Sequence, residues 1–451
     1  MVNKWSTADC ADCAGWPKPS ELTGRFQRVS IRFGRSVIPA LAGFGAFAVM
    51  VALALAGQNA LYEAIIKVMG VRPYPTAFLD TDTVLSAVRC LRAGIDAYAA
   101  NPCDPELRTY DYSPLWMVMT RLPMTKAWVP WIGTLFVLGF LASLLLLPAG
   151  RDGSAVKMII AGVLSSTTLL ALERGNNDLV VFAVVAGAAA LLGRSSAARK
   201  GAYVLATLAG LLKYYPMLVM ATALREKPLR FFAIGLTSLA ATALFAMISW
   251  PDLSRALALI PEGSPFGEMF GVANLGKGLV AALGLDPTIG KLVRAAMTIA
   301  ALGLGAWLGL RPATTAALRR LEARERNFLG VGVLMVIGCY FTAQNINYRA
   351  INLLLLLPSL TALRGTAAPL WLRGSSWLAL GLLWADFLRT WIVLAGLQAS
   401  HAVYVVIYYG PGWFLREAAW WSMACIAVAC AVALLRDGPL PNMVLGKREP
   451  V

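Results

Sequence analysis

Four short polar segments interrupt an otherwise apolar chain, and their side chains could support acid–base and phosphate chemistry. These segments are Asp80–Asp82, Glu173–Asp178, Lys213–Tyr215 and Gln344–Arg349. Carboxylates can take a proton from a hydroxyl group, arginine and lysine can neutralise a phosphate, and tyrosine offers a flat face to a sugar ring or an alkyl chain. Ionisable groups within a membrane are unfavourable unless they serve a pathway or a site. We therefore predict that the four segments share one functional cavity.

Taken singly, these segments also have structural explanations. Glu173 and Arg174 could form an internal ion pair between two helices, and Lys213 could extend its ammonium group to the membrane interface. Asp80 and Asp82 could be solvated carboxylates or N-caps of a helix. Both signs of charge occur among these residues, which favours a shared cavity over separate roles.

The elements that position these residues are predicted to be membrane-spanning helices. The chain has 451 residues, of which 58% are hydrophobic and 14% charged, with a mean hydropathy of +0.65. Runs such as Val37–Ala56 and Trp128–Leu147 approach the roughly 20 residues that cross a bilayer. We predict an all-α integral membrane protein with a cytoplasmic segment at 1–36, a transmembrane domain at 37–436 and a cytoplasmic tail at 437–451.

The basic residues predict which loops face the cytoplasm. A formal net charge of +16 would suggest nucleic acid binding in a soluble protein. Lysine and arginine also gather in the cytoplasmic loops of membrane proteins, and this simpler cause leads us to expect no nucleic acid partner. The basic loops are 151–157, 194–200, 225–230, 311–326 and 364–373, besides the two terminal segments. Placing them all in the cytoplasm gives about 11 to 12 spans and puts the four polar segments on the outer face.

One interval does not alternate as a single span. The loops 194–200 and 225–230 are both basic, so one helix between them would put them on opposite sides. Lys213–Pro216 lies midway, and its proline removes a backbone donor and breaks a helix. We predict a broken pair of limbs, 201–212 and 217–224, with the break at the outer face. Non-helical backbone at membrane depth requires surrounding protein or water, so the break also predicts a cavity.

The first outer loop, 57–126, is predicted to carry amphipathic helices. Apolar residues recur at helical spacing over Thr83–Ala93, and Gly94 is a suitable helix end. Asp80 would lie at the start of this helix, where the positive end of the helix dipole favours a carboxylate. Aromatic residues and prolines follow at 98–116, a composition typical of a segment that lies along the membrane surface.

The cysteines predict no metal site. Cys10 and Cys13 form a CxxC pair, but no second pair completes a zinc site, and the single histidine, His401, lies far along the chain. Cys90 and Cys103 share the first outer loop, where a disulfide could form if the loop lies outside the cytoplasm. We therefore expect neither a metal ion nor another cofactor.

The order of several motifs resembles glycosyltransferase family 87, a group of bacterial GT-C enzymes that use polyprenyl-phosphate sugars. Asp80 with LRAGIDAY (91–98) and YDYSPLW (110–116) is similar to the first outer loop of that family. GLLKYYP (210–216) resembles its Lys-hydrophobic-Tyr-Pro signature, and NYRAINLLLLLP (347–358) resembles a late helix that ends in proline. ERGNND stands where the family often carries Gly-Gln-x-Asn, and it departs from that pattern.

The resemblance, taken with the polar segments, assigns roles to individual residues. Asp80 would be the catalytic base, with Asp82 a close competitor. Lys213, Arg174 and Arg349 would bind the donor phosphate. The substrate-binding residues would be Glu173, Asn177, Tyr112, Tyr214, Tyr215, Asn347 and Tyr348.

The resemblance implies a GT-C-like bundle in the bacterial inner membrane, with its active site facing the extracytoplasmic side. Its expected activity moves mannose or a similar sugar, such as arabinose, from a polyprenyl-phosphate donor to an acceptor hydroxyl with inversion. The acceptor could be a glycolipid, a polysaccharide or a protein. Two alternatives remain open, a flippase for lipid-linked sugars and a non-catalytic envelope-assembly protein. A transporter often has two related halves, and the KYYP segment has no counterpart in the second half of the chain.

Overall fold

The computed structural model describes residues 19–74, 76–149, 153–260, 262–365, 367–399, 410–436 and 438. Cys10, Cys13 and His401 lie outside these residues, as do most of the predicted terminal segments.

The described chain is mostly helical, as the composition predicts. Its first half contains α1 (Pro19–Leu55), α2 (Asn59–Val68), α3 (Leu79–Arg92), η2 (Pro114–Arg121), η3 (Lys126–Trp128), α4 (Val129–Ser143), η4 (Leu144–Leu146), α5 (Ser154–Val163), α6 (Ser166–Arg174), α7 (Asp178–Leu192), α8 (Ser196–Lys213) and η5 (Tyr215–Arg225). Its second half contains α9 (Pro228–Ala258), α10 (Asn274–Leu283), α11 (Pro287–Leu310), α12 (Pro312–Arg319), α13 (Ala323–Thr342), η6 (Asn347–Leu355), α14 (Leu357–Ala362), η7 (Leu363–Gly365), α15 (Leu370–Leu383), α16 (Ala385–Ala399) and α18 (Trp413–Leu435). Two short strands, β1 (Met269–Phe270) and β2 (Asn345–Ile346), pair antiparallel.

Several helices are long and apolar enough to cross a membrane. Five segments of the described chain meet this test: Arg35–Leu55, Lys126–Leu146, Pro228–Ala258, Pro287–Leu310 and Gly410–Leu435. The bent pairs α5–α6 and α15–α16 raise the number to seven if each pair is one span. The 11 to 12 spans expected from alternating loops also count shorter pieces such as α7, whose 15 residues rise about 22 Å. A multi-span all-α membrane protein is thus confirmed in outline, with fewer full-length spans than the loop pattern predicts.

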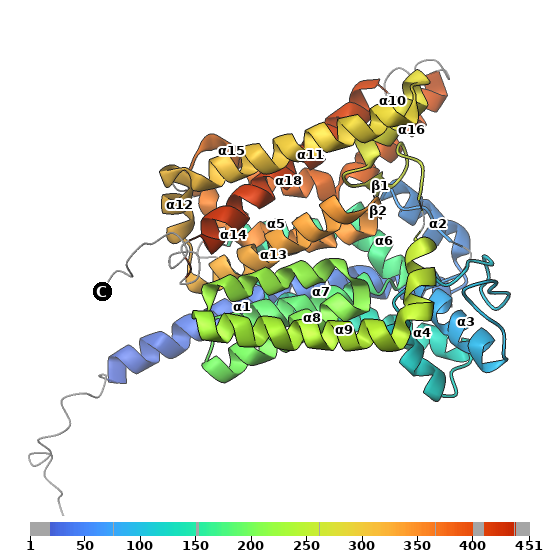
Figure 1. Ribbon diagram of the computed structural model, residues 1–451, viewed down its shortest axis with the longest axis horizontal. Helices are drawn as coiled ribbons and strands as arrows, with labels where there is room; N and C mark the ends of the chain where they lie inside the picture. Colours follow the sequence, from blue (N-terminus) through green and yellow to red (C-terminus); the bar gives the residue numbers. More distant parts are fainter. Residues whose placement is uncertain are drawn as a thin grey trace, which may run out of the picture.

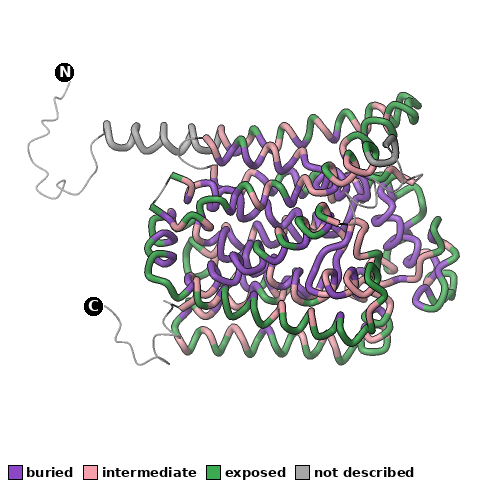
Figure 2. The backbone as a smooth tube through the Cα atoms, turned by 90° about the horizontal axis from the view of Figure 1, so that it is seen from above, coloured by how far each residue is buried: buried purple, intermediate pink, exposed green. Residues whose placement is uncertain are grey.

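Apolar side chains on the outermost helices lie on the surface rather than in the core. The most apolar window of α9 has no buried residue, and Leu236, Met247 and Ile248 of this helix are exposed. In contrast, α13 is buried along most of its length and packs against α18 and η5. Figure 2 shows buried segments in the middle of the bundle and exposed segments at its edges. Exposed apolar side chains are favourable in contact with lipid hydrocarbon and unfavourable in contact with water. The arrangement therefore fits a helical bundle surrounded by lipid.

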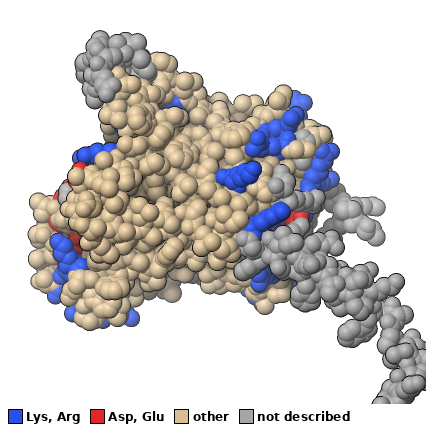
Figure 3. Space-filling model, turned by 180° about the vertical axis from the view of Figure 1, so that it is seen from behind, with Lys and Arg blue, Asp and Glu red and all other residues tan. Residues whose placement is uncertain are grey.

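The predicted basic loops gather at one end of the bundle, here called the basic end and comprising 153–157, 194–200, 225–230, 311–326 and 364–373. Arg199 donates to Glu226 across two of these loops at 2.9 Å, and Arg225 donates to Asn327 at 3.0 Å. Arg436 joins the group by hydrogen-bonding Thr315. Figure 3 shows lysine and arginine at this end, beyond a central belt that is free of charged side chains on the face shown.

The opposite end, here called the site end, contains α2, α3, the loop 93–113 and the β1–β2 pair (Figure 1). The four polar segments singled out in the sequence all lie at this end, because β2 and η6 follow α13 there and the turn after α6 faces α3. Thr81 donates to the carbonyl oxygen of Gly175 at 2.6 Å. The separation of a basic end from a mixed-charge end is the sidedness that the loops predict.

The chain reverses at Tyr214, which confirms the predicted broken pair. Helix α8 runs to Lys213 and η5 returns alongside it, so that Tyr203 near the start of α8 donates to Glu226 just after η5 at 3.2 Å. Tyr214 itself has a φ of 32°, a strained value for a residue with a side chain. Gly338 of α13 allows the close packing here, because a Cβ atom would lie 2.5 Å from the carbonyl oxygen of Tyr215.

The first outer loop is tied to α3 by a disulfide between Cys90 and Cys103. Helix α3 starts at Leu79, slightly before the predicted Thr83, and Gly94 follows its end with a φ of 75°. The guanidinium group of Arg89 donates to the carbonyl oxygen of Cys103 at 3.0 Å, which fixes the same turn a second time. The sequence left this disulfide open, and the structure contains it.

We predict that replacing both Cys90 and Cys103 by alanine lowers the melting temperature of the purified protein in detergent. A disulfide that closes a loop of about this size contributes roughly 3 kcal/mol by restricting the unfolded chain. Dithiothreitol should lower the melting temperature of the wild type and leave that of the double variant unchanged. An unchanged wild-type value in dithiothreitol would contradict a structural role for this bond.

Candidate active site

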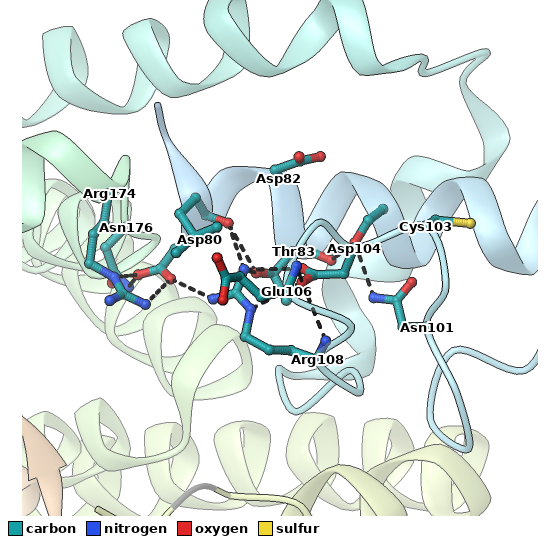
Figure 4. A network of polar contacts seen from close by, with 12 residues as sticks. Asp80, Asp82, Thr83, Asn101, Cys103, Asp104, Glu106, Arg108, Arg174 and Asn176 are labelled. Atoms are coloured by element: carbon teal, nitrogen blue, oxygen red, sulfur yellow. Dashed lines mark hydrogen bonds and ion pairs between the residues drawn. The ribbon is translucent and has the colours of Figure 1, made fainter. Parts of the chain in front are cut away.

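Asp80 lies at the centre of a buried polar network at the start of α3. Its carboxylate accepts two hydrogen bonds from Arg174 at the end of α6, from Nε at 2.8 Å and from the terminal nitrogen at 2.6 Å. The side-chain amide of Asn176 donates to the same carboxylate (Figure 4). Burial alone would raise the pKa of Asp80, but the charge of Arg174 and these hydrogen bonds lower it below its usual range. Asp80 is therefore a firmly ionised partner of Arg174.

Arg108 adds a second cation to this network. It pairs with Asp104 at 3.0 Å, lies 3.4 Å from Asp80, and donates to the carbonyl oxygen of Leu79 at 3.0 Å (Figure 4). It also hydrogen-bonds the hydroxyl group of Thr83. The loop after the disulfide is thereby fixed to the first turn of α3, and the oxygens of Asp80 are taken up by donors from three elements.

Asp82 does not join this network. It projects away from Asp80 and Arg174 in Figure 4, and pairs with Arg89 of the same helix at 3.0 Å. Residues two positions apart on a helix point in different directions, which explains how neighbouring carboxylates come to have separate partners. Asp82 is completely buried, and one of its oxygens has no hydrogen-bond partner among the described residues.

The turn between α6 and α7 must lie close to α3 for these contacts to form. Gly175 in this turn has a φ of 53°, and a Cβ atom there would come within 2.7 Å of Phe78 and Thr81. The amide of Phe78 donates to the carbonyl oxygen of Glu173 at 3.1 Å. Glycine is therefore required twice over, for the left-handed conformation and for the close approach.

A second ionic cluster centres on Asp178, the first residue of α7. Lys213 donates to its carboxylate at 2.6 Å, and the hydroxyl group of Tyr215 donates at 2.8 Å. Arg349 of η6 forms a longer ion pair with Asp178 at 3.6 Å. Lys213 also donates to Asn177 at 2.7 Å. Two cations thus share one carboxylate, which leaves positive charge at this place.

A cavity of about 490 Å³ opens beside this second cluster. Its polar wall includes Asp111, Lys213 and Arg349. Its apolar wall is formed by Leu212, Leu218, Leu257, Ile260, Ile337 and Phe341. Leu218 and Leu257 are also exposed on the outside of the bundle. The lining could therefore contact both a charged group and an apolar chain.

Asp111 supplies the cavity with a carboxylate that is free of ion pairs. Among the described residues, its carboxylate has no hydrogen bond with another side chain. Burial raises its pKa to about 6, although Lys213 and Arg349 act in the opposite direction. The loop that contains it is held by Ser113, whose hydroxyl group donates to the carbonyl oxygen of Leu211 in α8 at 2.7 Å. A carboxylate with this pKa, facing a cavity, has the properties of a general base.

Half of the residues predicted from the sequence line this cavity. They are Tyr112, Lys213, Tyr214, Tyr215, Tyr348 and Arg349. The other predicted residues do not line it: Asp80, Asp82, Glu173, Arg174, Asn177 and Asn347.

Tyr348 connects the cavity to the Asp80 network. The centre of its ring lies 5.7 Å from the ammonium group of Lys213 and 5.6 Å from the guanidinium group of Arg174. Asn347 turns elsewhere and donates to Asp386 at 2.6 Å. Glu173 accepts from the amide of Tyr74 at 3.3 Å. Arg174 and Asp80 thus support one wall of the cavity from behind.

Sequence reasoning missed Asp111 and Asp178 as site residues, although both lie within motifs it selected. Asp111 stands between two tyrosines in YDYSPLW, and Asp178 ends ERGNND. Asp178 opens an apolar helix, so its carboxylate would have to be buried, and this is the signal that could have identified it.

For a metal ion, no group of three or more histidine, cysteine, aspartate or glutamate residues is found within the described ranges.

Comparison of the chain with protein-family models, with curated proteins and with solved structures finds no match. The protein is defined so far by its class, a multi-span helical membrane protein with a charged cavity at one end. The resemblance to family 87 stays a prediction.

We predict that Asp178→Asn destabilises the protein by about 3 to 5 kcal/mol, because it leaves two buried cations without their shared counter-charge. The measurement is thermal unfolding in detergent. Asp96→Asn is the matched control, since Asp96 and Arg255 form an ion pair in which both side chains are more than 40% exposed, and such pairs contribute about 1 kcal/mol or less. Equal decreases in melting temperature for the two variants would show that Asp178 contributes no more to stability than an exposed ion pair does.

Proposed function

We propose that this protein is a membrane glycosyltransferase that moves a sugar, such as mannose, from a polyprenyl-phosphate donor to an acceptor hydroxyl at the extracytoplasmic face. The observation that carries the proposal is the lining of the cavity, which combines two cations, Lys213 and Arg349, with a set of apolar side chains. A lipid-linked phosphate has the same two parts in one molecule. On this proposal the bundle is GT-C-like, with the shorter helices completing about 11 to 12 crossings.

The two cations in the cavity would hold the donor phosphate. Lys213 and Arg349 share Asp178, so a second anion can be accommodated beside them. Fixed positive charge stabilises a phosphate as it leaves, and it requires no reorganisation during the reaction. Arg174 is committed to Asp80 by two hydrogen bonds. We therefore assign Arg174 to positioning Tyr348 rather than to direct phosphate contact.

Asp111 is the base that this geometry favours. It would take the proton of the acceptor hydroxyl, whose oxygen attacks the anomeric carbon from the face opposite the phosphate. The bond between that carbon and the phosphate oxygen breaks, and polyprenyl phosphate departs with the electron pair, which inverts the configuration. Tyr112 and Tyr348 offer ring faces for the sugar. Asp80 and Asp82, the bases expected from the sequence, have arginine partners and lie outside the cavity lining.

We predict that Asp111→Asn lowers the rate of sugar transfer by about a hundredfold or more, because general-base catalysis contributes that much. Asp82→Asn should change the rate little. The measurement is release of polyprenyl phosphate, followed by mass spectrometry, from protein in liposomes supplied with polyprenyl-phosphate mannose and an envelope-lipid extract. Asp96→Asn is the control for a carboxylate of the same loop.

The competing outcomes separate the alternatives. Full activity of Asp111→Asn, with loss of activity in an Asp80→Asn protein of unchanged melting temperature, would return the role of base to Asp80. Sugar-lipid that crosses the bilayer without bond cleavage would indicate a flippase. Absence of both in protein that folds normally would favour a non-catalytic assembly role.

The pH dependence provides an independent prediction. The base must be ionised to accept a proton, so kcat/KM should rise as pH increases through the pKa of Asp111, about 6. The acidic limb of the profile should be present in the wild type and in Asp82→Asn, and absent from the residual activity of Asp111→Asn. An identical acidic limb in Asp111→Asn would exclude this residue as the titrating group.

A further inference from the structure

The basic end contains a second cavity, which the proposed transferase reaction does not use. It measures about 800 Å³ and lies between the starts of α5 and α15, the segment that joins α12 to α13, and the end of α14. Its lining includes Arg320, Arg364 and Arg373. The charged wall is therefore at the opposite end of the bundle from Lys213 and Arg349.

The charge in this cavity is unbalanced. Glu325 is the one carboxylate among the described lining residues, and its side chain accepts from the amide of Glu322 at 2.8 Å in a capping box at the start of α13. Within the described ranges, none of the three lining arginines forms an ion pair with a carboxylate. Arg320 and Arg373 are exposed and Arg364 is half-buried, so an anion can reach all three guanidinium groups.

Two helix starts add to the attraction for an anion. Ser154 and Ala155 begin α5, Leu370 begins α15, and all three residues line the cavity. Each of these helix starts brings the positive end of a helix dipole to the cavity, which favours a bound anion.

An exposed apolar surface continues from the arginines along α15. The guanidinium group of Arg364 lies 4.5 Å from the ring centre of Trp377, which is 55% exposed, and Leu370 is 81% exposed. Tryptophan beside arginine is typical of the level where lipid headgroups meet hydrocarbon. A free phosphate would leave this apolar surface exposed, whereas an acyl chain attached to a phosphate would cover it.

We propose that this cavity binds the phosphate headgroup of an anionic phospholipid in the leaflet at the basic end. The arginines would contact the phosphate oxygens, for which the planar guanidinium group is well suited, and the acyl chains would lie along Trp377 and Leu370. This inference is independent of the proposed transferase activity, because no residue of the site end takes part in it.

The test uses the full-length protein in detergent and native mass spectrometry with added phosphatidylglycerol or phosphatidylcholine. We expect wild-type protein to retain phosphatidylglycerol in preference to phosphatidylcholine. The triple variant Arg320→Gln, Arg364→Gln, Arg373→Gln should bind phosphatidylglycerol about tenfold or more weakly, because each basic residue near a lipid phosphate contributes roughly fivefold. The matched control is Lys157→Gln, Arg194→Gln, Lys227→Gln, which removes equal charge from exposed residues of the same end outside this lining.

Equal loss of phosphatidylglycerol in both triple variants would overturn the proposal, since it would reduce the effect to general surface charge. Displacement of phosphatidylglycerol from wild-type protein by millimolar inorganic phosphate would also overturn it, and would assign the cavity to a free phosphate compound. If the triple variant unfolds, the single variants Arg364→Gln and Arg373→Gln replace it, and each should weaken binding by about fivefold. Unchanged binding in both single variants would reject the site.

Discussion

The buried carboxylate of Asp178 is the contact on which the site end depends. It receives Lys213 from the end of α8, Tyr215 from the start of η5 and Arg349 from η6. A buried charge is strongly unfavourable unless it is paired, so each partner requires the others to remain in place. The reversal of the chain at Tyr214 is therefore held by charge as well as by packing. The cavity lies against this reversal, since Leu212, Lys213, Tyr214 and Tyr215 all line it.

The Asp80 network also consists of buried ion pairs, but it holds the outer loop in place. Asp80 and Arg174 neutralise each other beneath the cavity, and Arg108 fixes the outer loop to them. A carboxylate held by an arginine and an amide is a poor proton acceptor, because every bond favours its ionised form. Asp111 belongs to the same loop but is not held by an arginine and an amide in this way. The first outer loop thus provides one carboxylate, Asp80, that stabilises the structure and another, Asp111, that is available to accept a proton.

The sequence was sufficient to predict the helical class, the two ends of the bundle and the convergence of the polar segments. Long apolar runs and basic loops carry that information directly, since each follows from the free energy of placing groups in lipid or water. The alternation of loops predicts about 11 to 12 spans, whereas five to seven segments of the described chain are long and apolar enough to cross a membrane, because the alternation also counts α7 and the limbs around Tyr214 without measuring their length. The choice between Asp80 and Asp111 was not available from sequence. It depends on Arg174 and Arg108, which reach Asp80 from 94 and 28 residues away.

The charges around the cavity suggest a role for a carboxylate, Asp111, that lines the same cavity as two cations, Lys213 and Arg349. Without a substrate, Lys213 and Arg349 both pair with Asp178, while Asp111 lines the same cavity and pairs with neither. A donor phosphate that binds to the cations would offset their effect on Asp111, whose pKa they otherwise lower. Asp111 would then be a stronger base with the donor in place than without it. On the proposed function, binding of the anionic lipid would thus make Asp111 a better proton acceptor when the sugar that the acceptor oxygen attacks is in place.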